Sequence, residues 1–161
     1  KGIALRKGFD YALQNDYQAV ITIDADLQHP PEFIPKFIEK ARQADVIIGN
    51  RMGDTKGMPW DRKLTNYLTS LILSWITHIH IADSQCGYRL IKSDFLSKLD
   101  LHSKHYDLES EIIIELATSG AKFDWVELPV IYQEKSVSYI NKFVDTIRFI
   151  KLVLWKLFSR R

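Results

Sequence analysis

Two aspartates stand one residue apart, directly after an apolar run, in the stretch VITIDADLQHPPEF over residues 20–33. Asp24 and Asp26 follow Val20–Ile23, whose apolar and β-branched character is typical of a buried strand. Carboxylates in such a place are costly unless they are solvated, paired or bound to a metal ion. Because two hard carboxylate oxygens at this spacing can flank one divalent cation, this D-x-D pattern predicts a site for Mg²⁺ or Mn²⁺.

Gln28 could add a carbonyl ligand to this cation or orient a water bound to it. Such a cation keeps several waters and binds the phosphates of a substrate, so the pattern indicates a phosphorylated substrate. The alternative is that Asp26 only caps a turn and Asp24 is exposed. The strand before the pair and the prolines after it favour the metal, and His29 is interpreted as a loop residue.

Composition restricts the class of protein. The 161 residues are about one domain in length, and the formal net charge of +2 gives no reason to expect binding of nucleic acid. The single cysteine, Cys86, cannot form an internal disulfide. It is interpreted as a small buried residue rather than a nucleophile, because no histidine partner is evident near it. No apolar run is long enough to cross a bilayer. The chain begins without methionine inside a helix-like stretch, so we expect it to be a piece of a longer protein.

The elements that must position these residues alternate between helix and strand. Periodicity predicts helices over 3–15, 32–44, 60–78 and 106–120, and strands over 19–24, 45–51 and 122–132, with an irregular segment leading into a short strand over 82–91. The strand–helix–strand order over 19–51 predicts a βαβ unit and a parallel sheet. In such sheets ligands bind beyond the carboxyl ends of the strands, where the aspartates lie.

Seven motifs, in one order over nearly the whole chain, resemble those of family-2 glycosyltransferases of the polyprenyl-phosphate type, which includes dolichyl-phosphate mannosyltransferase. They are KGIALRKGFDYA, DADLQHPPE, DVIIGNR, WDRKLTNYL, DSQCGYRLIKSD, YDLESEI and VELPVIY. The resemblance implies a GT-A fold, a Rossmann-like three-layer α/β fold with a mostly parallel sheet, over residues 1–134. It also implies an N-terminal truncation, because family members begin with a strand and a loop that hold the nucleotide base.

The resemblance also implies roles for the residues that follow the first two strands. Asp24, Asp26 and Gln28 would gather the metal and the diphosphate of a nucleoside-diphosphate sugar, with the metal as a Lewis acid and Asp26 as a catalytic residue. Arg51 would grip phosphate with its guanidinium fork, although an ordinary surface arginine is the alternative.

The resemblance also implies which residues bind the acceptor, beginning with an arginine and the residue one helical turn after it. Arg62 matches an arginine that receives the phosphate of the acceptor lipid, with simple helix solvation as the alternative. Its companion in the family is usually serine, and here it is Asn66, which can still donate a hydrogen bond. Ser136 and Ser138 lie in a stretch that resembles the family's acceptor loop and could contact the same phosphate.

Asp83 opens the DSQCGYR motif and is, by resemblance, a catalytic residue that acts as a general base or as a charge-positioning group near the acceptor. Gly87 would allow close approach of the backbone, and Arg89 would pair with phosphate or with a carboxylate such as Glu111. Glu109 and Glu111 lie two apart on a helix and therefore point to different sides. We expect Glu111 to be the glutamate that faces the site.

The last 27 residues, 135–161, combine the acceptor loop with a basic amphipathic helix. Its apolar residues share one broad face with Trp155 at the boundary, a pattern typical of a helix that lies on an anionic membrane surface. A helix packed on the sheet is the alternative from pattern alone. The resemblance favours the membrane, and we expect the protein at the cytoplasmic face, either peripheral or anchored by segments outside this chain.

The predicted function is metal-dependent transfer of a sugar from a nucleoside-diphosphate sugar to polyprenyl phosphate or another membrane-linked acceptor, with inversion at the anomeric carbon. One alternative is a catalytically incomplete transferase that acts as a membrane-docking or partner-binding module. The other is a D-x-D phosphatase of the haloacid dehalogenase type. That chemistry requires threonine or valine two residues after the second aspartate, where this chain has Gln28.

Overall fold

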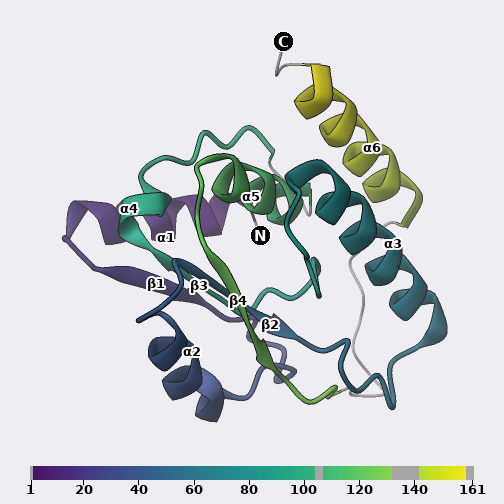
Figure 1. Ribbon diagram of the computed structural model, residues 1–161, viewed down its shortest axis with the longest axis horizontal. Helices are drawn as coiled ribbons and strands as arrows, with labels where there is room; N and C mark the ends of the chain where they lie inside the picture. Colours follow the sequence, from purple (N-terminus) through teal and green to yellow (C-terminus); the bar gives the residue numbers. More distant parts are fainter. Residues whose placement is uncertain (1, 104–106, 132–141, 159–161) are drawn as a thin grey trace.

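A four-stranded sheet lies between two layers of helices in the computed structural model, which describes residues 2–103, 107–131 and 142–158 (Figure 1). The strands are β1 (Ala19–Thr22), β2 (Val46–Asn50), β3 (Arg89–Lys92) and β4 (Phe123–Glu127). The helices are α1 (Gly2–Gln14), the 3₁₀ turn η1 (Pro31–Phe33), α2 (Ile34–Lys40), α3 (Trp60–Thr77), α4 (Ser93–Leu96), α5 (Asp107–Thr118) and α6 (Lys142–Phe158). This arrangement confirms the predicted three-layer α/β class.

The strand order is β1-β3-β2-β4. β3 runs antiparallel to both of its neighbours, whereas β2 and β4 are parallel, so three of the four strands point the same way, as predicted. The sequence did not predict that β3 lies between the first two strands. Hydrophobic periodicity identifies a segment as a strand but carries no information on its neighbour in the sheet.

This topology brings distant segments to one edge of the sheet. β1, β2 and β4 end there, and the antiparallel β3 begins there, because Arg89 is in register with Thr22 of β1 and with Ile48 of β2. β1 ends at Thr22, so Asp24 and Asp26 lie in the turn that follows it. Ligands of open α/β sheets bind at such an edge.

Helices cover both faces of the sheet. α2 packs on β3 and β4 from one side, and α1, α4 and α5 lie on the other (Figure 1). Val46, Ile47 and Ile48 of β2 are fully buried between these layers, as are Ile113 and Ile114 of α5. Burial of such side chains is worth about 2 kcal/mol each, so β2 and α5 form the centre of the core.

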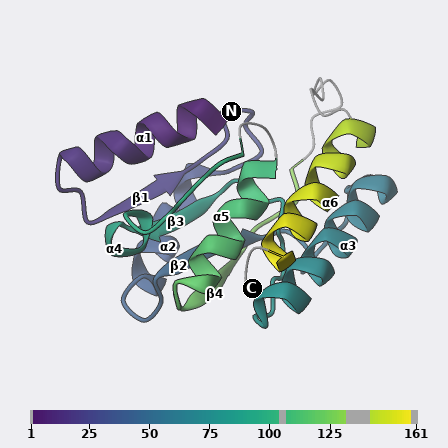
Figure 2. The same ribbon diagram turned by 90° about the horizontal axis from the view of Figure 1, so that it is seen from above.

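α3 and α6 lie at the same end of the molecule, and both pack on α5 (Figure 2). α6 is attached through Leu152, which joins the core, and through an ion pair between Lys156 and Glu115. Among the described residues, no helix is both long enough and apolar enough to span a membrane.

Candidate active site

The turn after β1 contains both aspartates of the D-x-D pattern. The Asp24 side chain is partly buried and Asp26 is exposed. The turn is tight, with Leu27 at a φ of +63°, and the backbone N–H of Gln28 donates to Oδ1 of Asp26 at 3.1 Å. This hydrogen bond therefore keeps the carboxylate of Asp26 close to the backbone of Gln28.

The donor set of this turn fits a hard divalent cation. No group of three or more His, Cys, Asp or Glu residues that could hold a metal occurs within residues 2–103, 107–131 and 142–158. The turn thus supplies two carboxylates and one amide, and a cation bound there would need waters and substrate phosphates to complete its coordination. Mg²⁺ and Mn²⁺ accept such mixed oxygen ligands.

His29 braces this turn from inside the protein. The backbone N–H of Asp24 donates to Nδ1 of His29 at 3.1 Å, and the ring is only 4% exposed. It packs against Tyr88, which in turn stacks on Phe37 with 4.3 Å between ring centroids. Because Nδ1 accepts a hydrogen bond, this contact assigns the proton to Nε2. The interpretation of His29 as an ordinary loop residue was therefore incomplete.

Cys86 is fully buried, as predicted, but it does have a histidine beside it. Its Sγ lies 3.9 Å from Nε2 of His29, a residue 57 positions away in the sequence. Burial, followed by the nearby charge of Asp83, raises the pKa of the Cys86 thiol to about 12. A thiol with this pKa stays protonated, so the expectation that Cys86 is not a nucleophile agrees with its surroundings.

The carboxylate of Asp83 is fully buried and saturated with hydrogen bonds. Oδ2 accepts from Nε of Arg51 at 2.8 Å and from its backbone N–H at 3.1 Å. Oδ1 accepts from Nη2 of Arg51 at 3.1 Å, from Nδ2 of Asn66 at 2.7 Å and from the backbone N–H of Gln85 at 3.1 Å. Burial alone would raise the pKa of Asp83, but the hydrogen bonds and charge of Arg51, together with Asn66, outweigh it and lower the pKa below its ordinary value.

This geometry distinguishes between the two roles expected for Asp83. A carboxylate with a lowered pKa and five donors is a poor general base, so the geometry favours a charge-positioning role. The Arg51 fork is held by Asp83, and Asn66 points into the same buried cluster. Contact of Arg51 or Asn66 with a substrate phosphate stays a prediction.

Arg89, at the start of β3, donates hydrogen bonds to several backbone carbonyls. Its guanidinium donates to the carbonyls of Ser84, Cys86 and Glu109 at 2.8–2.9 Å, and the side chain is almost fully buried. The nearest carboxylate oxygen is Oε2 of Glu109, at 4.0 Å from Nη2. Glu111, the carboxylate expected beside Arg89, was therefore the wrong one, and pairing of Arg89 with phosphate stays a prediction.

Glu111 faces a different part of the protein. Its carboxylate is fully buried and accepts from the backbone N–H groups of His102 and Ser103 at 2.8–3.1 Å, with Nζ of Lys156 at 4.0 Å. Glu109 is the glutamate on the side of the aspartates. The expectation that Glu111, and not Glu109, faces the site was therefore wrong. Residues two apart on a helix differ by about 200° in direction, and periodicity does not say which of them faces the site. A catalytic role for Glu111 stays a prediction.

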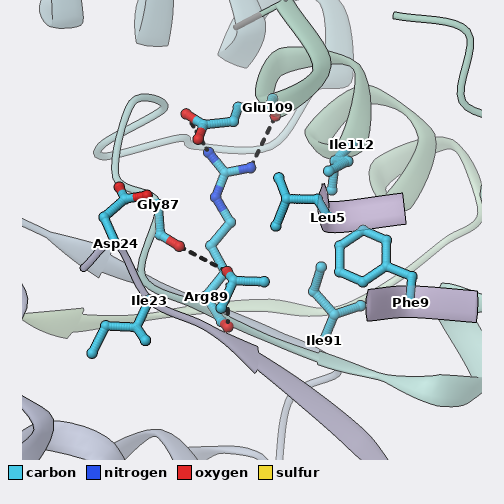
Figure 3. Close-up of a pocket in the computed structure, with 10 residues that line it drawn as sticks. Leu5, Phe9, Ile23, Asp24, Gly87, Arg89, Ile91, Glu109 and Ile112 are labelled. Atoms are coloured by element: carbon cyan, nitrogen blue, oxygen red, sulfur yellow. Dashed lines mark hydrogen bonds and ion pairs between the residues drawn. The ribbon is translucent and has the colours of Figure 1, made fainter. Parts of the chain in front are cut away.

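A pocket next to Asp24 joins the turn to α1 and α5 (Figure 3). Its polar end carries Asp24, Arg89 and Glu109, and its apolar wall includes Leu5 and Phe9 of α1 (Figure 3). Gly87, which was predicted to allow close backbone approach, is buried in the lining, and its carbonyl accepts from Thr22 Oγ1 at 2.7 Å. Of the charged groups of the site, Asp24, Arg89 and Glu109 thus line one cavity.

The remaining predicted residues lie on the acceptor side. Arg62 is half-buried in the first turn of α3, one helical turn before Asn66. Ser136 and Ser138 fall outside the described residues.

Comparison with known proteins gives one family match and several relatives. A sequence profile described as glycosyl transferase family 2 matches residues 1–100. An uncharacterized protein of Methanocaldococcus jannaschii is 36% identical over 150 residues, which is 88% of this chain and 64% of the relative. The undecaprenyl-phosphate mannosyltransferase of Micrococcus luteus is 30% identical over 142 residues, 84% of this chain and 58% of the relative.

A further relative, the polyprenol monophosphomannose synthase of Mycolicibacterium smegmatis, is 27% identical over 168 residues, 99% of this chain and 63% of its own length. The chain therefore spans between 58% and 64% of the length of these three relatives.

Asp83→Asn is expected to lower the free energy of unfolding by about 3 kcal/mol, because it removes the buried negative charge that pairs with the guanidinium of Arg51. Urea denaturation at pH 7 measures this change. Asn66→Ala, which removes one neutral donor and keeps the ion pair, serves as the comparison and is expected to cost about 1 kcal/mol. Equal stability of Asp83→Asn and the parent would contradict the assignment of this ion pair as the main support of the cluster.

The same pair of proteins tests the pKa of Asp83. Because the folded-state pKa is lowered below 3.8, the stabilisation is fully present above about pH 4 and is lost as the pH falls through the folded value. The stability difference between parent and Asp83→Asn should stay constant from pH 7 to about pH 5 and shrink at lower pH. Asp45 and Asp124, whose pKa values are also lowered, contribute equally to both proteins.

Cys86 is expected to resist alkylation in the folded protein, because its thiol is buried and its pKa is about 12. Mass spectrometry after treatment with iodoacetamide at pH 8 measures the modified fraction, with the urea-unfolded chain as the reactive control. Complete modification of the folded chain at the rate of the unfolded chain would mean that the thiol is exposed or activated.

Proposed function

The chain belongs to glycosyltransferase family 2, and on this premise we propose that it transfers a sugar from a nucleoside-diphosphate sugar to a polyprenyl phosphate. The observation that carries the proposal is the D-x-D turn at the carboxyl end of β1, beside a pocket that also presents Arg89 and Glu109. The names of the relatives from Micrococcus luteus and Mycolicibacterium smegmatis support a polyprenyl acceptor.

Asp24, Asp26 and Gln28 are the residues that would hold Mg²⁺ or Mn²⁺. When bound, the cation would neutralise negative charge that develops on the leaving nucleoside diphosphate. Asp26 is exposed at the tip of the turn and is within reach of a solvent-facing diphosphate, whereas Asp24 lines the pocket. The hydrogen bond from Asp24 to His29 fixes the backbone from which both carboxylates project.

The proposed reaction is a direct displacement. A phosphate oxygen of the acceptor forms a bond to the anomeric carbon while the bond from that carbon to the diphosphate oxygen breaks, so the configuration inverts. An acceptor phosphate that is already ionised supplies its own electron pair and needs no proton acceptor. Asp83 therefore acts by holding Arg51 and Asn66, with Arg51 and Arg62 as the proposed phosphate-binding cations.

The acceptor lipid places the proposed reaction at a membrane surface, and we assign it to the cytoplasmic face on the family resemblance. α6 supports a surface location, because Ile147, Ile150, Leu154 and Phe158 of its predicted apolar face are exposed. The helix is attached to α5 through Leu152 on its opposite side. These four side chains are therefore not used for packing on the sheet.

Binding of donor is expected to require metal and Asp26. Titration calorimetry of UDP-sugars and of GDP-mannose, with and without Mn²⁺, measures this requirement. Asp26→Asn removes a charged ligand and is expected to weaken Mn²⁺-dependent binding by at least about tenfold. Asp10→Asn, at an exposed position of α1, is the matched control and should bind as the parent does.

Metal-independent binding, or unchanged binding by Asp26→Asn, would contradict the proposed site. A folded chain that binds no donor in either condition would favour the alternative of a catalytically incomplete transferase that docks to a membrane or a partner.

His29 is expected to position the metal-binding turn. His29→Leu removes the acceptor for the Asp24 N–H, and the affinity for Mn²⁺ in the presence of UDP should fall by about tenfold. His29→Asn places a carbonyl oxygen near the position of Nδ1 and should restore much of the affinity. Electron paramagnetic resonance of free Mn²⁺ gives the affinities, and thermal unfolding gives the stabilities. Equal Mn²⁺ affinities of the two variants, with unequal stabilities, would show that His29 acts on folding alone.

A further inference from the structure

Glu127, the last residue of β4, is bound to the last residue of β2. The two residues are partners in the parallel register of the sheet, and Oε1 of Glu127 accepts a hydrogen bond from Nδ2 of Asn50 at 2.7 Å. Glu127 is exposed, whereas Asn50 is only 9% exposed. An exposed glutamate ordinarily extends into water and keeps its rotamer freedom. Here the carboxylate is held at the edge of the sheet instead.

The side-chain amide of Asn50 connects this carboxylate to the loop after β2. Its Oδ1 accepts from the backbone N–H of Met52 at 2.9 Å, while the backbone carbonyl of Asn50 accepts from the N–H of Leu128 at 2.8 Å. Because Oδ1 faces the N–H of Met52, Nδ2 must face an acceptor, and a buried amide without one is costly. The carboxylate of Glu127 supplies that acceptor and thereby fixes the orientation of the amide.

Gly53 lies against the other oxygen of the same carboxylate. A Cβ atom at this position would be 2.4 Å from Oε2 of Glu127, which is closer than such atoms approach one another in folded proteins. With the carboxylate in this position, only glycine fits in the loop. Both oxygens of Glu127 therefore support the loop, one through Asn50 and the other beneath Gly53.

Arg51 lies between the two residues that this contact holds. Its guanidinium and its backbone N–H bind Asp83, whereas Asn50 and Met52 on either side of it are held through Glu127. Arg51 is one of the two proposed phosphate-binding cations. A guanidinium fork recognises phosphate by its direction, which depends on the backbone as well as on the side chain.

We propose that Glu127 is a positioning residue for Arg51 and acts through Asn50 and the backbone of residues 50–53. The inference rests on the proposed function, because it concerns how Arg51 is presented to the phosphate of the acceptor. Glu127 orders the backbone that carries the guanidinium, and Asp83 orders the guanidinium itself.

A metal-binding role for Glu127 does not fit the sheet. β3 and β2 lie between β1 and β4, so a strand spacing of about 4.8 Å places Glu127 about 14 Å from the end of β1. Oxygen ligands lie about 2 Å from Mg²⁺, so one cation cannot bind both Glu127 and the aspartates after β1. Glu127 therefore acts on the loop after β2.

Hydrogen exchange, measured by heteronuclear NMR on the full chain without metal or donor, tests the proposal. In Glu127→Ala the backbone N–H of Met52 and the Nε–H of Arg51 should exchange at least about fivefold faster, because the order provided by one hydrogen bond is lost. The Nε–H of Arg89, which donates to the carbonyl of Cys86 at 2.8 Å, is the internal control and should exchange at the parent rate.

Three further variants separate position from charge and from stability. Glu127→Gln keeps an oxygen acceptor for Asn50 and should exchange as the parent does. Gly53→Ala keeps the charge but pushes the carboxylate away from Asn50, and it should reproduce the result of Glu127→Ala. Asp124→Ala removes an ion pair elsewhere on β4 and should leave both exchange rates unchanged.

Unchanged exchange at the Nε–H of Arg51 in Glu127→Ala would overturn the proposal, whether or not Met52 exchanges faster. Equal acceleration at Arg89 would show a general loss of stability and contradict it as well. A loss in Glu127→Gln as large as that in Glu127→Ala would mean that the charge of Glu127, and not the position that it fixes, is what matters.

Calorimetry with geranyl phosphate, a short prenyl phosphate, measures the consequence for binding. Glu127→Ala should weaken this binding by about fivefold, and Glu127→Gln should bind as the parent does. Binding by Glu127→Ala at the parent affinity would overturn the proposal. Failure of the parent itself to bind would contradict the proposed acceptor and not the positioning of Arg51, which the exchange rates decide.

Discussion

The orientation of several segments at this end of the molecule depends on the buried negative charge of Asp83. A carboxylate without exposure to water needs several donors, and here they come from the end of β2, from α3 and from the segment before β3. Each of these segments must therefore take one orientation. For α3 the consequence is that its polar side faces inward, and for Arg51 it is that the guanidinium stays at the edge of the sheet.

A second set of contacts links the D-x-D turn to the rest of the site. His29 receives the Asp24 N–H on one ring nitrogen and faces Cys86 with the other. Arg89 gathers the carbonyls of the segment that contains Cys86, so the turn after β1 and the loop before β3 are parts of one rigid unit. Such support would limit the motion of the two carboxylates that we propose as metal ligands, and a preorganised site needs this restriction.

The polar inner side and the apolar outer side of α3 result from the same packing arrangement. The helix satisfies Asp83 on its inner side, and its aromatic side chains therefore remain outside. The exposed aromatic side of α3 thus lies directly behind the buried Asp83, which binds Arg51 and Asn66.

Local pattern in the sequence determined the α/β class, most of the helices and strands, and the D-x-D turn that follows β1, because each of these depends on residues within a few positions of one another. The order of the motifs along the chain predicted the family, and the family-2 match confirms it. Only the tertiary structure decided that Glu109 and not Glu111 lies beside Arg89, and that His29 meets Cys86. It also decided that α3 turns its aromatic side outward. These outcomes depend on which faces of distant segments meet, and periodicity along the chain carries no information about that choice.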